Sequence, residues 1–319
     1  MSNATIKPDR PPLPAATPVS SFHPVVLPAP DRAVDLELRV SAPAAGKDLP
    51  ILLFSHGFGA SNFIASMRGY GPLVDFYAAH GFVVIQPTHQ SSKTLGLDPD
   101  GLEGPLFWKS RAQDMRYIID HLDTIEATVP GLSGRLDKNR IAAVGHSMGG
   151  HTVAMLAGMR VTDPRSGELV DLTEPRIGST VMFGTPGNGA DLAEFAKEHY
   201  TVLAHNDFSS MKMPALVVAG DQDSNARFSD RQDWRLDAYP LSPGPKCQLI
   251  VYGGGHMLGG ISGFDAAETS DEDPQRVADV QWLTWSYLRT GLYPEDKAWE
   301  TATRELSGTA NPFGKVDCK

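Results

Sequence analysis

Short apolar stretches punctuate this chain, and longer stretches with a helical pattern lie between them. Residues 34–40 alternate apolar and polar side chains, which predicts a strand with one buried and one exposed face. The remaining stretches are continuous apolar runs, which are typical of strands buried on both faces of a parallel sheet. These runs cover residues 51–54, 82–85, 141–144, 180–183, 215–218 and 249–252.

Helical patterns separate these strands and cover residues 70–80, 108–128, 149–159, 191–200 and 274–290. Strands that alternate with helices in this way predict an α/β fold with a mostly parallel, doubly wound sheet flanked by helices. Residues 185–213 are too few to form a large lid domain. Residues 1–30 are rich in proline, and we expect an extended arm there, followed by a single domain over residues 31–319.

Composition narrows the range of partners. The chain has 319 residues, with hydrophobic and charged shares of 41% and 21% and a formal net charge of −10. The negative charge argues against nucleic acid, because binding phosphates requires a basic surface. No apolar stretch approaches the ~20 residues of a transmembrane helix. We expect a soluble protein, with a cytoplasmic location favoured over export by a removed signal, and the sequence leaves the oligomeric state open.

The chain has two cysteines, Cys247 and Cys318. No Cys-x-x-Cys motif is present, and no His, Asp or Glu cluster has the spacing of a metal site, so the sequence predicts neither a metal nor another cofactor. Two free thiols are the favoured interpretation of the cysteines. A disulfide between them is the alternative, since sequence alone does not place their Cα atoms.

The sequence Gly-His-Ser-Met-Gly at residues 145–149 lies between the strand predicted at 141–144 and the helix predicted at 149–159. A sharp strand-to-helix turn exposes the serine in its middle, and glycines two residues before and after leave room for that turn. We therefore predict that Ser147 is a nucleophile. A glycine-rich turn that cradles phosphate is the alternative, but no lysine follows the motif.

A serine hydroxyl needs a base, and in this arrangement an acid and then a histidine follow the serine along the chain. His256 lies in a glycine-rich loop just after the strand predicted at 249–252, and we predict that it is the base. Asp221 and Asp223 follow the strand predicted at 215–218, at the edge where α/β sites form. We favour Asp223 as the acid that orients His256, with Asp221 as the alternative and otherwise as a brace for the turn.

Acyl transfer places negative charge on a carbonyl oxygen, which backbone N–H groups stabilise in an oxyanion hole. We expect one N–H from Met148, directly after the nucleophile, and a second from Phe58 in the glycine-containing loop after residues 51–54. Several side chains near the ends of the predicted strands are candidates for a substrate pocket, with ordinary packing as the alternative: Phe63, His89, Trp108, Phe183 and Met257.

The stretches Phe-Ser-His-Gly-Phe-Gly-Ala at 54–60, Ala-His-Gly-Phe-Val-Val at 79–84 and Gly-His-Ser-Met-Gly-Gly at 145–150 resemble the platelet-activating factor acetylhydrolase family. The related chlorophyllase and dienelactone-hydrolase-like groups share much of this pattern, which spans about residues 50–260. This resemblance implies the α/β-hydrolase fold and the roles given above to Ser147, Asp223 and His256. The dienelactone branch typically uses a cysteine nucleophile, so the serine at this position argues against that chemistry.

These features together predict a serine carboxylic-ester hydrolase, similar to esterases and lipases, that works through an acyl-enzyme. The resemblance to chlorophyllases implies a fairly apolar, small-molecule or lipid-like ester as the substrate. An acyltransferase or a peptide or amide hydrolase would use the same residues. A catalytically idle binding protein of the same fold is the alternative from another class, although the sequence retains each residue that the mechanism requires.

Overall fold

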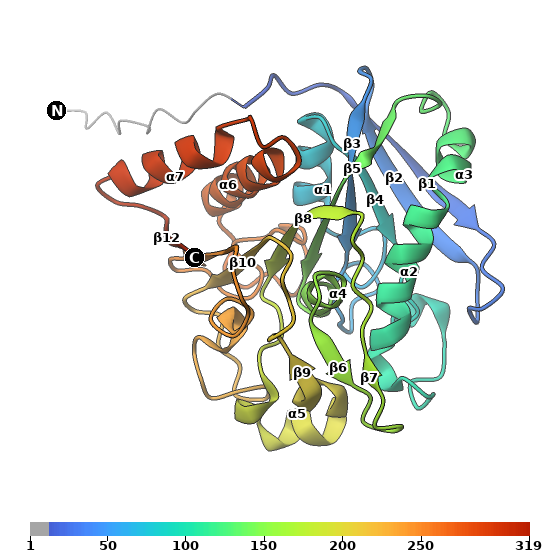
Figure 1. The fold of residues 1–319 in the computed structure, drawn as a ribbon, viewed down its shortest axis with the longest axis vertical. Helices are drawn as coiled ribbons and strands as arrows, with labels where there is room; N and C mark the ends of the chain where they lie inside the picture. Colours follow the sequence, from blue (N-terminus) through green and yellow to red (C-terminus); the bar gives the residue numbers. More distant parts are fainter. Residues whose placement is uncertain (1–12) are drawn as a thin grey trace.

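A nine-stranded sheet forms the centre of the computed structural model, which describes residues 13–319 (Figure 1). The strands follow one another across the sheet in the order β1-β2-β4-β3-β5-β8-β10-β11-β12. The inner strands are parallel and comprise β4 (Val83–Pro87), β3 (Leu49–Ser55), β5 (Leu136–His146), β8 (Ile177–Phe183), β10 (Ala215–Gly220) and β11 (Lys246–Val251). The antiparallel strands at the edges are β1 (Val19–Leu27), β2 (Leu36–Pro43) and β12 (Gly314–Cys318).

Helices cover both faces of the sheet, as Figure 1 shows. In β3, Ile51 and Leu53 pack into a core with α2 (Trp108–Asp120), α3 (Leu122–Thr128) and α4 (Met148–Leu156). The alternate residues Leu52 and Phe54 pack into the opposite core with α1 (Gly71–Ala79), α6 (Pro274–Leu292) and α7 (Ala298–Gly308). Successive side chains of a strand point to opposite faces, so a strand covered on both sides must be apolar throughout. The predicted doubly wound α/β fold is confirmed.

Several local features differ from the sequence prediction. The helix expected over residues 108–128 is interrupted at His121, where α2 ends and α3 begins. The segment between β8 and β10 carries only short elements, which include α5 (Glu194–His199) and β9 (Asn206–Asp207). Strand β9 forms a small second sheet with β6 (Arg160–Thr162) and β7 (Leu169–Val170), which lie before β8 in the chain. Short 3₁₀ helices complete the fold: η1 (Lys93–Leu95), η2 (Gly104–Leu106), η3 (Gly189–Asp191), η4 (Thr201–His205) and η5 (Trp234–Leu236).

The arm predicted for residues 1–30 needs a correction. Residues 19–27 form the edge strand β1, in which Val25 and Leu27 are buried against the sheet. The pairing of β1 with β2 shifts register around Pro24, and proline is tolerated at such edge positions because it has no N–H to donate. The sheet therefore begins at residue 19, while residues 1–12 of the predicted arm lie outside the described part of the chain.

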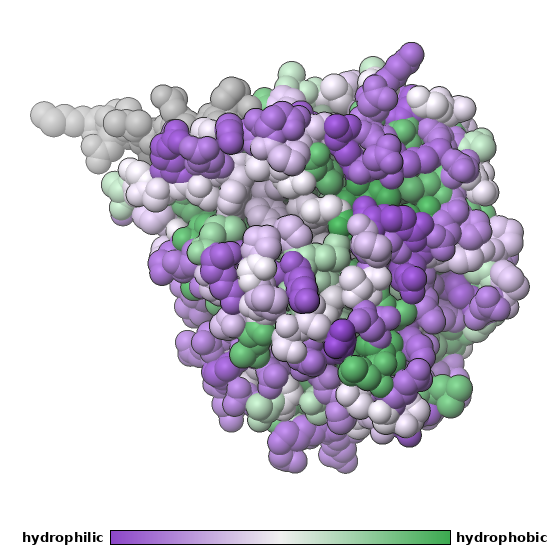
Figure 2. Space-filling model, viewed as in Figure 1, coloured by the Kyte–Doolittle hydropathy of each residue, from purple (hydrophilic) through white to green (hydrophobic). Residues whose placement is uncertain are grey.

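One face of the protein is largely polar. On the face seen in Figure 2, hydrophilic residues predominate, and hydrophobic residues gather only in small patches. No helix within residues 13–319 is long and apolar enough to cross a membrane.

The two cysteines are bonded to each other, which corrects the expectation of free thiols. Cys247 in β11 lies directly opposite Cys318 in β12 in the antiparallel register, and their sulfur atoms are 2.02 Å apart. This register depends on how β12 returns to the edge of the sheet, which the sequence pattern did not reveal. The disulfide therefore ties the C-terminal strand to the strand that leads into the loop carrying His256.

Replacing Cys318 with alanine is expected to lower the free energy of unfolding by about 2–4 kcal/mol, because the bond closes a long loop of the unfolded chain. The bonded residues are separated by 71 positions in the sequence. Urea unfolding of the wild type and of Cys318→Ala measures this difference. A reducing agent should lower the unfolding midpoint of the wild type and leave that of Cys318→Ala unchanged. Equal midpoints for the two proteins under oxidising conditions would contradict the prediction.

Candidate active site

Ser147 lies at the sharp turn between β5 and α4. Its backbone has φ 56° and ψ −119°, a left-handed conformation that residues with a side chain rarely adopt. Its amide donates a hydrogen bond of 2.8 Å to the carbonyl oxygen of Phe183 at the end of β8. Strained backbone at a position that the surrounding structure fixes is a common property of functional sites. The turn holds the serine at the carboxyl edge of the parallel sheet, directly before the N-terminus of α4.

The glycines on either side of Ser147 make this turn sterically feasible. A Cβ atom on Gly145 would lie 2.1 Å from the carbonyl oxygen of Gly149. A Cβ atom on Gly149 would lie 1.9 Å from the carbonyl oxygen of Ser55, at the end of β3. The chain can therefore pass from strand to helix only with glycine at both positions, which is the requirement expected from the sequence motif.

His256 and Asp223 come together at the same edge of the sheet. The Nδ1 atom of His256 lies 2.8 Å from Oδ2 of Asp223, and the Nε atom of Arg235 lies 3.2 Å from Oδ1. Burial alone would raise the pKa of the Asp223 carboxyl, but Arg235 and His256 outweigh it and hold that pKa well below its usual range. Asp223 is therefore an ionised carboxylate that accepts a hydrogen bond from the His256 ring.

Two further carboxylates hold the loop that carries His256. Asp221, the alternative acid, is exposed and accepts a hydrogen bond of 2.8 Å from the amide of Gly253. Asp271 accepts hydrogen bonds from the amides of Gly255, at 2.7 Å, and Gly259, at 3.0 Å. Sequence analysis anticipated a bracing role for Asp221 but missed Asp271, which lies in a polar loop with no distinguishing motif.

The two amides expected to bind an oxyanion lie on separate elements. Met148 is the first residue of α4, and Phe58 lies in the loop that follows β3. Within residues 13–319, neither the Met148 amide nor the Phe58 amide donates a hydrogen bond to a protein acceptor. The first amides of a helix point outward along its axis, where the helix dipole favours negative charge.

Arg111 in α2 connects these two elements, and sequence analysis missed it. Its buried guanidinium contacts the carbonyl oxygen of His56 in the loop before Phe58 and donates from Nε to Thr152 Oγ1 at 3.1 Å. The Thr152 hydroxyl in turn donates to the carbonyl oxygen of Met148 at 2.9 Å. Burial lowers the pKa of Arg111 to about 9. The only sequence signal for Arg111 is a basic residue on a helix, which ordinarily indicates a solvent-exposed position.

Three of the predicted pocket residues need a correction. Phe183 is fully buried in the core, so it cannot line an open cleft. His89 is also fully buried, and both of its ring nitrogens have protein partners, Ser55 Oγ at 2.8 Å and Asp114 Oδ2 at 2.9 Å. Trp108 is 2% exposed and lines a small cavity of about 50 Å³. Trp108 and Phe183 belong to the two hydrophobic cores on opposite faces of the sheet, and His89 is held by polar partners in the loop after β4.

The other two predicted pocket residues, Phe63 and Met257, retain contact with solvent. Phe63 is exposed and Met257 is half-buried. A pair of aromatic side chains that sequence analysis missed, Tyr200 and Phe228, packs beside Phe58. Tyr200 packs with its ring centre 6.1 Å from that of Phe58, and Phe228 stacks on Tyr200 at 5.7 Å. These three rings are half-buried and form a row of contacts that begins at the loop carrying the Phe58 amide.

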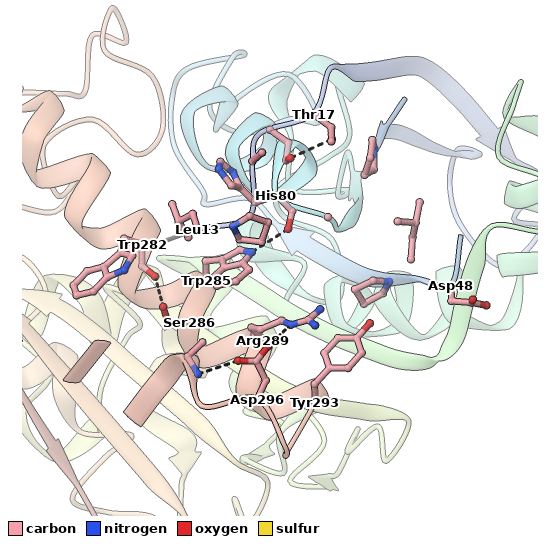
Figure 3. Close-up of a pocket in the computed structure, with 18 of the residues that line it drawn as sticks. Leu13, Thr17, Asp48, His80, Trp282, Trp285, Ser286, Arg289, Tyr293 and Asp296 are labelled. Atoms are coloured by element: carbon pink, nitrogen blue, oxygen red, sulfur yellow. Dashed lines mark hydrogen bonds and ion pairs between the residues drawn. The ribbon is translucent and has the colours of Figure 1, made fainter. Parts of the chain in front are cut away.

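A cavity of about 860 Å³ lies elsewhere in the fold (Figure 3). It is lined by the start of β3 at Leu49 and by Trp285 and Tyr293 near the end of α6. Ser147 follows the carboxyl end of β5, which runs parallel to β3, so the cavity opens at the opposite edge of the sheet. Because sites in parallel α/β sheets form at the carboxyl ends of the strands, the site around Ser147 is the better candidate. Within the described residues, no group of three His, Cys, Asp or Glu side chains is placed to hold a metal ion.

A sequence model of the alpha/beta hydrolase family matches residues 52–280, which include Ser147, Asp223 and His256. A search of the curated proteins finds no match. The matched region covers more than half of the chain and runs from β3 into α6. The chain therefore belongs to the alpha/beta hydrolase family.

Proposed function

We propose that the protein is a serine carboxylic-ester hydrolase that works through an acyl-enzyme. Membership of the family indicates a hydrolase of this fold. The observation that supports ester hydrolysis through an acyl-enzyme is the hydrogen bond of 2.8 Å between His256 Nδ1 and Asp223 Oδ2. This bond lies at the same sheet edge as the strained turn at Ser147. An ionised acid that orients a histidine, at the sheet edge that also carries a serine on a sharp turn, is the arrangement that nucleophilic acyl transfer needs.

In the first half of the reaction, the Ser147 hydroxyl attacks the ester carbonyl while His256 accepts its proton at Nε2. The bond between the carbonyl carbon and the alkoxy oxygen then breaks, and His256 returns the proton to the leaving alcohol. In the second half, His256 takes a proton from water, which attacks the acyl-enzyme and releases the acid. The protein ends in its starting state, with one water molecule consumed for each ester.

Asp223 and the two free amides supply the electrostatic stabilisation in this scheme. Asp223 keeps the proton of the neutral His256 ring on Nδ1, so that Nε2 can act as the base, and it stabilises the imidazolium that follows. The amides of Met148 and Phe58 receive the negative charge that develops on the carbonyl oxygen. Neither amide is engaged by another protein group within residues 13–319, so both remain available for this role.

The substrate class that these surroundings favour is an ester with an apolar group. The rings of Phe58, Tyr200 and Phe228 are half-buried and adjoin the candidate oxyanion loop. Aromatic rings with an open face bind apolar groups and exclude water from them. The resemblance to platelet-activating factor acetylhydrolases and chlorophyllases favours the same class.

A panel of p-nitrophenyl esters, with acyl groups from acetyl to dodecanoyl, tests this proposal. We expect the purified protein to hydrolyse esters of the panel, with kcat/KM rising as the acyl group lengthens from acetyl. The matching p-nitroanilides should react far more slowly, and added alcohol or amine acceptors should divert little of the acyl group from water. The absence of turnover on every ester, or faster reaction with anilides, would contradict the proposal.

A further inference from the structure

A chain of buried hydrogen bonds connects the oxyanion loop to the loop that carries His256. The amide of Gly57 lies 3.0 Å from the hydroxyl oxygen of Tyr70. That oxygen lies 2.8 Å from Nδ1 of His146. The other ring nitrogen of His146, Nε2, lies 2.9 Å from the carbonyl oxygen of His256. Tyr70 is fully buried and His146 is 1% exposed, so water does not compete for the first two bonds. The third bond is partly buried.

The chemistry of the two ends fixes the direction of every bond in this chain. The Gly57 amide can only donate, so the Tyr70 oxygen accepts from it. The Tyr70 hydroxyl is then free to donate its own proton to Nδ1 of His146. The carbonyl of His256 can only accept, so His146 must carry its proton on Nε2. A neutral His146 protonated at Nε2 therefore satisfies every donor and acceptor in the chain.

The surroundings of His146 keep it in this neutral form. Burial, together with the neighbouring His256, lowers the pKa of His146 to about 3. Burial raises the pKa of Tyr70, so its hydroxyl remains a donor at neutral pH. The chain therefore keeps the same proton arrangement across the range in which a serine hydrolase works.

The backbone around Tyr70 is also adapted to this chain. Tyr70 has φ 64°, a left-handed conformation that is costly for a bulky residue, and its amide donates to the carbonyl oxygen of Ser262 at 2.9 Å. A Cβ atom on Gly57 would lie 2.9 Å from the Tyr70 hydroxyl, so the close approach needs glycine at that position. The ring of Tyr70 packs on Phe54 of β3, with ring centres 4.9 Å apart.

We propose that Tyr70 and His146 are positioning residues. They fix the positions of the Phe58 amide and of the His256 ring relative to Ser147. Gly57 directly precedes Phe58, His146 directly precedes Ser147, and the final bond fixes the backbone of His256 itself. One chain of bonds thus reaches the electrophilic, nucleophilic and basic parts of the site. The inference rests on the proposed ester hydrolysis. It adds residues that touch no substrate and act only through their neighbours.

Replacing Tyr70 with phenylalanine removes one hydroxyl and breaks the chain in the middle. A displacement of reacting groups by about 1 Å can cost ~10²-fold in rate, and we expect Tyr70→Phe to lower kcat on a short-chain ester by roughly 10-fold or more. KM should change by less than about threefold, because no substrate contact is lost. Steady-state kinetics and thermal unfolding measure both effects.

Tyr77→Phe is the matched control. Tyr77 lies in α1, is fully buried, and its hydroxyl lies 2.8 Å from Thr284 Oγ1, away from the site. Both variants lose one buried hydroxyl, so both should lower the stability by a similar amount. Only Tyr70→Phe should lower kcat. A kcat for Tyr70→Phe equal to that of Tyr77→Phe would overturn the inference.

His146 provides a second test through a conservative replacement. Glutamine has an amide oxygen that can accept from Tyr70 and an amide nitrogen that can donate to His256, whereas leucine has neither. We expect His146→Gln to retain most of the wild-type kcat and His146→Leu to lose about as much as Tyr70→Phe. The double variant Tyr70→Phe/His146→Leu should lose little more than either single variant, because both break one chain. Equal kcat for the glutamine and leucine variants, or additive losses, would overturn the inference.

If the proposed ester hydrolysis is wrong, the wild type will hydrolyse no ester, and this result differs from a failure of the positioning role of Tyr70 and His146. In that case, NMR of the histidine ring protons still tests the chain of bonds. The Nε2 proton of His146 should exchange slowly with solvent in the wild type and in Tyr77→Phe, and rapidly in Tyr70→Phe. Rapid exchange in the wild type would overturn the inference.

Discussion

Replacing Ser147 with alanine is expected to lower the turnover of p-nitrophenyl esters by ~10⁴-fold or more. The alanine variant has no nucleophile for the acyl-enzyme, so only the oxyanion site and substrate binding remain to assist attack by water. The substitution removes one oxygen atom and keeps the turn between β5 and α4, so the cooperative unfolding transition should persist. Initial rates at saturating substrate, together with thermal unfolding, measure both outcomes.

Ser209→Ala is a suitable control for this experiment. Ser209 is exposed, and its amide contacts only Asp207 in a polar turn. Its substitution should leave turnover within about twofold of the wild type, as is usual for exposed surface positions. A folded Ser147→Ala variant with near-normal turnover would exclude Ser147 as the nucleophile.

Replacing Asp223 with asparagine is expected to lower kcat by ~10³–10⁴-fold. The side-chain amide of asparagine can donate to Nδ1 of His256, which favours the tautomer with its proton on Nε2 and removes the base. It also leaves the buried guanidinium of Arg235 without its carboxylate partner. Because the pKa of Asp223 lies well below its usual range, the wild-type carboxylate stays ionised above about pH 5. The deficit of Asp223→Asn should therefore appear across the whole range from pH 5 to 9.

Asp221→Asn separates the two aspartates. Asp221 lies two residues before Asp223 in the same turn but is exposed and bonds to the amide of Gly253 rather than to His256. We expect Asp221→Asn to retain kcat within a few-fold of the wild type and to lower the stability of the loop slightly. A large loss of kcat in Asp221→Asn with little loss in Asp223→Asn would transfer the role of the acid to Asp221.

The sequence predicts well those strands whose pattern of apolar residues directly reflects which of their faces are buried. Strands such as β3 and β10 are continuous apolar runs because helices cover both of their faces. The edge strand β1 escaped prediction because its sequence neither alternates regularly nor forms a continuous apolar run, and because it contains a proline and pairs on one side only. Strand β12 and its disulfide escaped for a different reason, since the pairing of Cys318 with Cys247 depends on a long-range register.

The residues of the candidate site likewise fall into two groups, those in a local motif and those that long-range contacts bring together. Ser147 and its glycines form a local motif, so their geometry follows from the sequence. Tyr70 lies 76 residues before His146, and nothing in either local pattern indicates that their side chains meet. Arg111 likewise becomes important only when the fold buries it against the oxyanion loop. Residues that position a site across long separations in the chain become visible only in three dimensions.

Covalent labelling with a fluorophosphonate tests the central claim most directly, because this reagent phosphonylates a serine only where a base activates it and an oxyanion site accepts the charge. The labelled protein would be digested and the adduct located by mass spectrometry. The account predicts one adduct per chain, on the peptide that contains Ser147, with concomitant loss of ester turnover. No labelling of the folded protein, or an adduct on another serine that abolishes turnover while Ser147 stays unmodified, would contradict it.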